Sequence, residues 1–298
     1  MSIFDRFRRK KQAPQIPPPA PAKAPPAPKE PEKPSVSPEP DITATLLLRK
    51  NIGWDAVVKA IEEHFGSQVL GNVEDNGYSS FESVKAKVPA ATVTLEDVEF
   101  WCSYLAMPHP TQICDFSKIE DGLFSYEERE EIEQNQAFLV LAQKGGGQDL
   151  ASKRQVCRLF TRLAGTLMGL EDAAGIYVCS AELLISRSEY LKHAGILEEN
   201  RDDPSYFPVP VWVALRRRKK GEHVLTGTWG LRQFGLLELW FLDEDTAWTE
   251  LYQRLYLLSI TQITGRDFYE DMDTIEFTPG KTSLFRELNG ALFIKEID

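Results

Sequence analysis

The residues best suited to chemistry stand at Lys144, Gly145, Gly146 and Gly147, between a predicted strand and a predicted helix. Glycines let the backbone N–H groups at a helix N-terminus converge on an anion, and a lysine adds positive charge. The spacing matches neither G-x-x-x-x-G-K-S/T nor G-x-G-x-x-G, and Asp149 would repel an anion. Two interpretations stay open, an anion or ligand site and a flexible glycine connection.

A cysteine–histidine pair is the next candidate for catalysis. Cys102 precedes His109 by seven residues, and nucleophilic attack needs an exposed thiolate within hydrogen-bond reach of the histidine. Cys102 stands between Trp101 and Ser103 in an apolar extended run, so we expect it to be buried. None of the four cysteines forms a C-x-x-C pair or a zinc-ligand spacing with a histidine, and Glu270, Asp271 and Asp273 favour a solvated turn. We predict no catalytic residues, no metal site and no cofactor.

The first eleven residues combine apolar and basic side chains. Ile3, Phe4 and Phe7 would share one face of a helix, and five cations, Arg8, Arg9 and Lys10 among them, oppose one carboxylate. This combination is typical of weak, salt-sensitive attachment to an anionic bilayer surface. The alternative is a solvated basic leader without a membrane role.

Charge is distributed unevenly along the 298 residues. Residues 1–40 carry eight Lys or Arg and four Asp or Glu, whereas the remainder carries 26 and 41, which gives a net charge of +4 against −15. An acidic folded region disfavours non-specific binding of nucleic acid, so we expect none. The basic run at 216–220 is expected to form a solvated hairpin end, with phosphate or RNA binding as the minor alternative.

The elements that must position these residues favour a mixed fold. Residues 14–40 hold 12 of the 19 prolines, so residues 1–41 are predicted to be a basic leader with a disordered Pro-rich tail. Strand and helix patterns alternate from 42 to 298, and several strands form hairpins. We predict an α+β fold of two ferredoxin-like halves with mostly antiparallel sheets, at about 42–112 and 113–298.

The folded region resembles the bacterial family called domain of unknown function 4261. The resemblance rests on short motifs, of which the clearest are Thr45–Leu48 before a Trp54-led helix, the Ala142–Gly147 loop, Pro208–Trp212, and Met272–Phe277. It covers roughly residues 42–298 and implies neither an activity nor site residues.

We therefore expect a bacterial cytoplasmic protein that works as a non-catalytic binding or interaction module, with an immunity-type protein that caps a toxin through its acidic face as one form. A protein partner is expected, and an anionic membrane surface at the inner face is the alternative partner of the leader. An enzyme or ligand-binding protein that uses the glycine loop is the alternative function.

Vesicle binding tests the leader. Replacing both rings with carboxylates, Phe4→Glu/Phe7→Glu, removes the apolar contacts and reverses local charge, so co-sedimentation with anionic liposomes at low salt should fall several-fold. If the wild type and this variant sediment equally, the amphipathic anchor is wrong.

Overall fold

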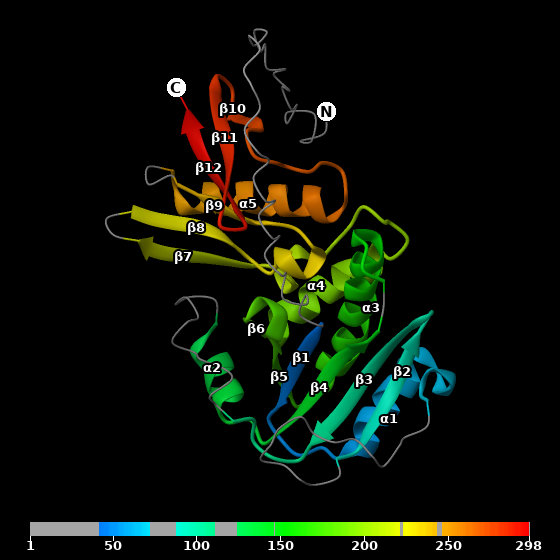
Figure 1. Ribbon diagram of the computed structural model, residues 1–298. Helices are drawn as coiled ribbons and strands as arrows, with labels where there is room; N and C mark the ends of the chain where they lie inside the picture. Colours follow the sequence, from blue (N-terminus) through cyan, green and yellow to red (C-terminus); the bar gives the residue numbers. More distant parts are fainter. Residues whose placement is uncertain are drawn as a thin grey trace, which may run out of the picture.

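The computed structural model describes residues 42–71, 88–110, 124–145, 147–220, 223–242 and 246–297. These residues form two six-stranded sheets and five α-helices (Figure 1). The predicted α+β class with antiparallel-rich sheets is confirmed. The predicted tail, residues 1–41, lies outside the described residues.

The first sheet has the strand order β2-β3-β4-β1-β5-β6, and all neighbouring strands are antiparallel. β4 and β5 lie on either side of β1 and are joined by α3 (Leu150–Met168), so one strand splits this strand–helix–strand unit. The strands are β1 (Thr43–Leu48), β2 (Ala90–Leu95), β3 (Val98–Leu105), β4 (Ala137–Lys144), β5 (Ala173–Val178) and β6 (Leu183–Ser186).

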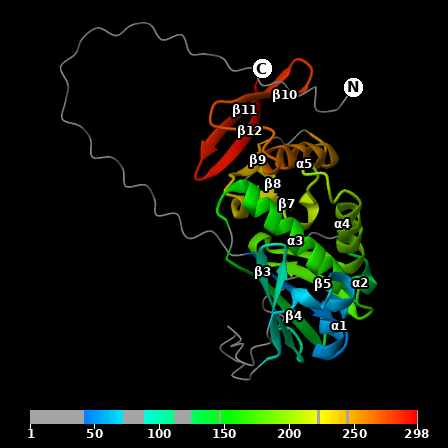
Figure 2. The same cartoon turned by 90° about the vertical axis from the view of Figure 1, so that its right-hand side faces the viewer.

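Helices cover both faces of the first sheet. On one face lie α1 (Trp54–Phe65), α3 and α4 (Arg187–Glu199), which bury apolar side chains against the sheet (Figure 2). On the other lies α2 (Tyr126–Glu133), whose Ile132 packs with Phe138 in a second, smaller core. Local signals set the helix ends, since Ser125 and Glu128 form the predicted capping box of α2, and Asp149 caps α3.

The second sheet has the order β10-β11-β12-β9-β8-β7, and only the β12–β9 pair is parallel. Its helix is α5 (Trp248–Ile263), whose Leu251, Leu255 and Leu258 join a core with Leu239 and Phe285 of the sheet. The strands are β7 (Ala214–Lys220), β8 (His223–Trp229), β9 (Glu238–Phe241), β10 (Thr274–Thr278), β11 (Lys281–Leu288) and β12 (Ala291–Ile297).

The two sheets divide the chain at a different point from the predicted halves, 42–112 and 113–298. The first sheet draws on residues 43–186 and the second on residues 214–297. The reason is the position of β4, which lies between β3 and β1 and pairs with both through backbone hydrogen bonds. A boundary near 112 would leave those two strands without their shared neighbour.

A buried polar network lies where the two sheets meet, and there the Ser180 hydroxyl, just after β5, donates to the Gln233 side-chain oxygen at 2.6 Å. The Glu238 carboxylate accepts hydrogen bonds from the Thr228 hydroxyl at 2.8 Å and from the backbone N–H groups of Gly230 at 2.8 Å and Arg232 at 3.3 Å. Backbone N–H groups thus balance this buried carboxylate, while the Arg232 guanidinium donates to the Gly290 carbonyl at 3.3 Å. The Gln233 amide donates to the Trp212 carbonyl at 2.8 Å.

The same joint requires close backbone approach. At Gly230, where φ is +124°, an added Cβ would lie 2.5 Å from the Trp212 carbonyl oxygen and 3.0 Å from the Ala181 Cβ. The Trp212 indole N–H donates to the Thr161 hydroxyl of α3 at 2.9 Å, so the loop is held to the helix of the first sheet. Only glycine fits at this position without moving backbone.

Two glycines at positive φ provide a matched test of this joint. Gly265→Ala, at φ +69° with open space around it, should cost about 1 kcal/mol of unfolding free energy from backbone strain alone. Gly230→Ala adds steric overlap and should cost at least about 2 kcal/mol more. Thermal unfolding of both variants measures the difference, and equal melting temperatures would contradict the close approach.

Candidate functional site

The predicted glycine-loop site borders a surface hollow. Lys144 ends β4, Gly145 has φ +74°, and Gly147 leads to α3, while Gly146 lies outside the described residues. The hollow measures about 560 Å³ and is closed on its other sides by the β2–β3 turn and the first turns of α3. The loop therefore has room for a small ligand.

The charges around this loop are already paired. The Lys144 ammonium lies 3.2 Å from the Glu99 carboxylate. The Asp149 carboxylate accepts from the Ser152 N–H at 3.0 Å and from its hydroxyl at 2.6 Å, and thereby occupies the helix N-terminus. These hydrogen bonds from Ser152 lower the pKa of Asp149. The anion site stays a prediction, and the local electrostatics oppose it.

The cysteine and the histidine lie on opposite faces of the first sheet. Cys102 is buried in the core under α3, where desolvation raises the pKa of its thiol to about 12. His109 packs edge-on against Phe138 at 4.8 Å, within the smaller core of the other face. A thiolate–imidazole pair cannot form, as expected from the apolar neighbours of Cys102.

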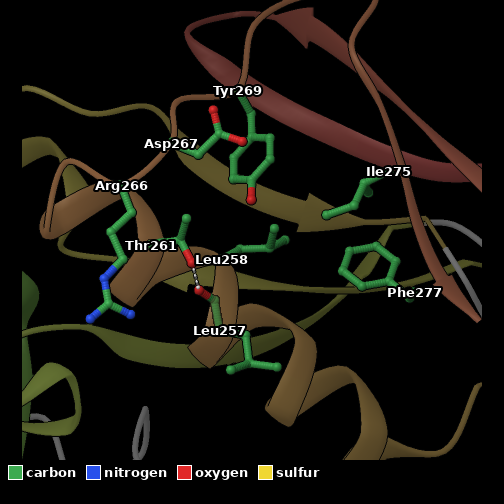
Figure 3. Close-up of a pocket in the computed structure, with 8 residues that line it drawn as sticks. All are labelled: Leu257, Leu258, Thr261, Arg266, Asp267, Tyr269, Ile275 and Phe277. Atoms are coloured by element: carbon green, nitrogen blue, oxygen red, sulfur yellow. Dashed lines mark hydrogen bonds between the residues drawn. The ribbon is translucent and has the colours of Figure 1, made fainter. Parts of the chain in front are cut away.

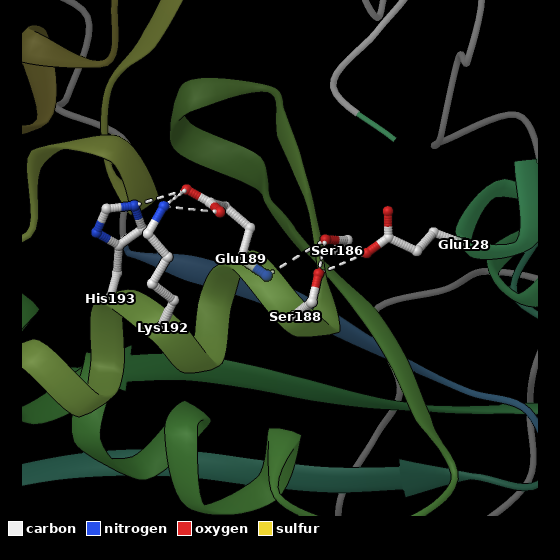
Figure 4. A network of polar contacts seen from close by, with 6 residues as sticks. All are labelled: Glu128, Ser186, Ser188, Glu189, Lys192 and His193. Atoms are coloured by element: carbon white, nitrogen blue, oxygen red, sulfur yellow. Dashed lines mark hydrogen bonds and ion pairs between the residues drawn. The ribbon is translucent and has the colours of Figure 1, made fainter. Parts of the chain in front are cut away.

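A serine–carboxylate network joins α2 to α4 (Figure 4). The Ser188 hydroxyl donates to the Glu128 carboxylate at 2.5 Å and lies 3.0 Å from the Ser186 hydroxyl. Partial burial favours the neutral carboxyl, but the hydrogen bonds from Ser188 and Ser125 outweigh it and lower the pKa of Glu128. His193 bonds instead to Glu189, at 2.9 Å. Hydrogen bonds that lower the pKa of Glu128 make it a weak base, and no histidine side chain that the structure describes bonds to Ser188, so the network links α2 to α4 and forms no serine–histidine pair.

A small cavity of about 160 Å³ lies between α5 and β10 (Figure 3). Its walls are mainly apolar, with Leu258, Ile275 and Phe277 among them, and the Thr261 hydroxyl at its edge donates to the Leu257 carbonyl at 2.7 Å. Its size matches a benzene-sized void in a core. We assign it no function.

The structure bears on three other features considered in the sequence: the leader, metal-ligating side chains and the acidic turn. Ile3, Phe4, Phe7, Arg8, Arg9 and Lys10 of the leader lie outside the described residues. Within the part of the chain that the structure describes, no cluster of three metal-ligating side chains occurs, and no helix is long and apolar enough to cross a bilayer. Asp271 and Asp273 accept hydrogen bonds from the backbone N–H groups of Glu287 and Glu270, at 2.9 and 2.7 Å.

The most distinctive surface is the face of the second sheet opposite α5, which we call the open face. Strand register brings Arg216, Gly227, Trp240, Phe293 and Arg286 side by side across five strands. At Gly227 an added Cβ would lie 2.4 Å from the Trp240 ring, so the indole lies directly on the backbone of β8. Alternation along the strands adds these side chains: Arg218, Leu225, Trp229, Leu242, Leu284, Leu288, Lys295 and Ile297. Met272 precedes β10 with φ +69° and joins this face through its sulfur, which lies 3.2 Å from the Arg286 guanidinium.

Arginines stack on the tryptophans of this face. The Arg216 guanidinium lies 4.9 Å from the Trp229 ring centroid, and that of Arg218 lies 5.1 Å from Trp229 and 5.5 Å from Trp240. These distances are within the cation–π range. Arg216 also pairs with Glu182 at 3.2 Å, whereas Arg218 is exposed and makes no ion pair with a described residue. The open face therefore combines apolar area with available positive charge.

Exposed apolar side chains concentrate here. Eight large apolar side chains are exposed among the described residues, and four of them lie on the open face: Leu242 at 41%, Met272 at 59%, Leu288 at 56% and Ile297 at 39%. Scattered exposed apolar residues are ordinary, but several on one sheet face that also carries cations favour an interaction surface. This is the candidate functional site.

Sequence analysis did not identify this site. Of its cations, Arg216 and Arg218 had been considered as part of a solvated hairpin end; the hairpin forms and Arg218 is exposed, and both guanidinium groups also stack on aromatic rings. One sequence feature could have indicated an apolar outer face: Leu284, Leu288 and Phe293 occupy outward positions in strands whose inward residues are also apolar.

Comparisons with family models, with curated proteins and with solved structures found no match. They therefore give no support to the predicted resemblance to the family called domain of unknown function 4261.

Titration tests the occupied helix N-terminus of α3. Because hydrogen bonds lower the pKa of Asp149, its carboxylate contributes stability above the unfolded-state pKa of about 3.9, and this contribution is lost as the pH falls through the folded-state pKa. Asp149→Ala should therefore melt below the wild type at pH 7, and the gap should close at low pH.

The exposed Asp202→Ala variant serves as the control, because its carboxylate caps no helix. A gap between Asp149→Ala and the wild type that stays constant from pH 7 to pH 2 would contradict the carboxylate cap.

Proposed function

We propose that the protein is a non-catalytic binding module whose interaction surface is the open face of the second sheet. The observation that supports this proposal is the gathering of Leu242, Met272, Leu288 and Ile297 on one face that also carries arginine-covered tryptophans. The apolar side chains of this surface are in contact with water when it is uncovered. A partner that covers them removes that area from water, which is favourable.

The chemistry of the face favours a protein partner with apolar and acidic side chains. Arg218 and Lys295 are exposed and form no ion pair with a described residue, so they are available to carboxylates of the partner. Arg286 is paired with Asp271 at 3.2 Å and contributes less. Apolar contact would supply affinity, and the cations would set orientation and association rate.

Nucleic acid fits the face less well. Base binding needs open aromatic faces, but Arg216 and Arg218 cover the Trp229 ring and Trp240 is only 7% exposed. The net charge of −15 on residues 41–298 would also repel phosphates. An immunity-type protein that binds through its acidic face would require a basic partner, the opposite of the partner proposed here.

A ligand-binding protein or enzyme that uses the glycine loop is the second candidate. The hollow of about 560 Å³ beside Gly145 and Gly147 favours it, and the Lys144–Glu99 and Asp149–Ser152 pairs oppose it. A thermal-shift series with inorganic phosphate and nucleotides would separate the two, since a hit lost in Gly146→Asp would favour the loop.

Two finer features belong to the same proposal. The order β3-β4-β1-β5 with α1 and α3 supports a ferredoxin-like unit in the first sheet, with β2 and β6 added at its edges. The parallel β12–β9 pair does not support a second such unit. Cytoplasmic location, with peripheral attachment through the leader, also remains a proposal.

Site-specific cross-linking in living cells tests the binding surface. A photoreactive benzophenone side chain at Leu288 or Met272 should yield one discrete cross-linked protein, because both side chains are more than half exposed on the open face. The same group at Phe268, 44% exposed but outside that face, provides the matched control and should yield none.

Charge reversal then tests the partner's chemistry. Arg218→Glu should reduce the cross-link at Leu288 at least fivefold, because an acidic partner loses its counter-charge. A yield that rises with Arg218→Glu would favour a basic partner, and equal cross-linking from Leu288 and Phe268 would contradict the proposed surface.

A further inference from the structure

β7 is the outermost strand of the second sheet (Figure 1). Among the described strands it pairs only with β8, from Ala214 opposite Trp229 to Lys220 opposite His223. In an antiparallel pair, every second residue directs its N–H and C=O groups away from the neighbour. β7 thus offers a row of backbone donors and acceptors to which a further strand could bond.

The arginines of β7 turn toward the two faces of the sheet. Arg216 and Arg218 stack over Trp229 on the open face, at 4.9 and 5.1 Å, while Arg217 lies 5.6 Å from the Trp248 ring of α5 on the other face. Cationic side chains commonly protect a sheet edge from pairing. Here the ring contacts direct three consecutive cations above and below the edge, which leaves the backbone between them accessible to another strand.

We propose that β7 accepts an extended acidic segment of a protein partner as an additional strand. This inference rests on the proposed function, since it specifies how the acidic partner of the open face is held. Backbone hydrogen bonds supply the main attachment, and side chains that alternate between the two faces supply specificity.

Charge determines which strand fits. Cross-strand pairs of opposite charge stabilise a sheet and like charges directly opposite destabilise it, so carboxylates opposite Arg217 and Arg218 are favourable. Arg216 already pairs with Glu182 at 3.2 Å and contributes less. A second copy of β7 would instead set five consecutive cations, residues 216–220, against five cations. The occupant is therefore a partner segment and not another copy of this chain.

The strand also sets the dimensions of the segment. β7 has seven residues, so a segment of about seven residues in extended form would cover it. Partner residues opposite Arg216 and Arg218 would lie on the open face and continue its apolar and cationic surface. The partner would thereby contact the edge and the open face together.

A peptide of alternating glutamate and valine, seven residues long and capped at both ends, serves as the probe with the full chain. At saturating peptide, the β7 amides that do not bond to β8 should exchange with deuterium at least tenfold more slowly, as followed by nuclear magnetic resonance. Amides in β2, the outer strand of the first sheet, should not change, because β2 carries no cation.

Two N-methylated forms of this peptide separate strand addition from charge attraction. Methyl groups on the alternate amides that face β7 remove its hydrogen bonds, whereas methyl groups on the other amides leave them intact. The peptide methylated on the amides that face away from β7 should bind within threefold of the parent peptide. The peptide methylated on the amides that face β7 should bind at least tenfold more weakly. Arg217→Glu/Arg218→Glu should weaken the parent peptide at least tenfold as well.

Other outcomes would overturn the inference. If both methylated forms bind equally, the contact is electrostatic only, and if no peptide protects β7, the cations serve only to protect the edge. Cross-linking at Leu288 reports the open face independently. A Leu288 cross-link without β7 protection would contradict strand addition alone, whereas β7 protection without that cross-link would contradict the open-face proposal alone.

Discussion

A β-sheet buried on one side only leaves its other side to water or to a partner, and this constraint governs the second sheet. α5 buries Leu239, Phe285 and Ile294 beneath one face. On the opposite face the strands carry Trp229, Trp240 and Phe293 with arginines and exposed aliphatic residues, and no described helix lies across them. In the first sheet, by contrast, helices occupy both faces.

Interactions within the second sheet preserve this face in the isolated protein. Gly227 admits the Trp240 ring against the backbone of β8, and Arg218 covers it, so the largest apolar group is nearly withdrawn from water. Glu238, on the same side of β9, is satisfied by Thr228 and by backbone N–H groups near the joint. The end of the face near the joint is therefore fixed by buried polar contacts, and Leu288 lies at the same level of the sheet, beside Ala291.

Local signals predicted much of the fold. Helical periodicity that ends at Gly66 is enough to predict α1, the Ser-x-x-Glu pair Ser125 and Glu128 predicts α2, and Asp149 is a typical cap for the start of α3. β11 was not predicted because a strand with one solvent-exposed face normally alternates apolar and polar residues. In β11, Leu284 and Leu288 on the outward side are apolar, as is Phe285 on the inward side. The pattern at 68–73 favours a weak strand, whereas the described part has a 3₁₀ turn at Ser67–Val69 and a single bridge at Leu70, and residues 72 and 73 lie outside the described residues.

The candidate site could not be predicted because it depends on pairing between distant strands. Arg216 and Arg286 are 70 positions apart, and only the register through β8, β9 and β12 aligns them. The glycine loop, by contrast, was visible in sequence, but its charges are neutralised by Glu99 from β3, which sequence spacing did not reveal. Nor did the sequence indicate that consecutive arginines would stack on three tryptophans from β8, β9 and α5.

Dye binding to the purified full chain measures the central claim most directly. Anilinonaphthalene sulfonate is anionic and aromatic, so its fluorescence should report a surface that is both apolar and cationic. The open-face account predicts bright binding that Met272→Glu/Leu288→Glu reduces at least fivefold. The control pair Tyr126→Glu/Phe268→Glu, whose side chains are also exposed but lie elsewhere, should leave it unchanged. Equal loss of fluorescence in the two variants, or loss in the control alone, would contradict the account.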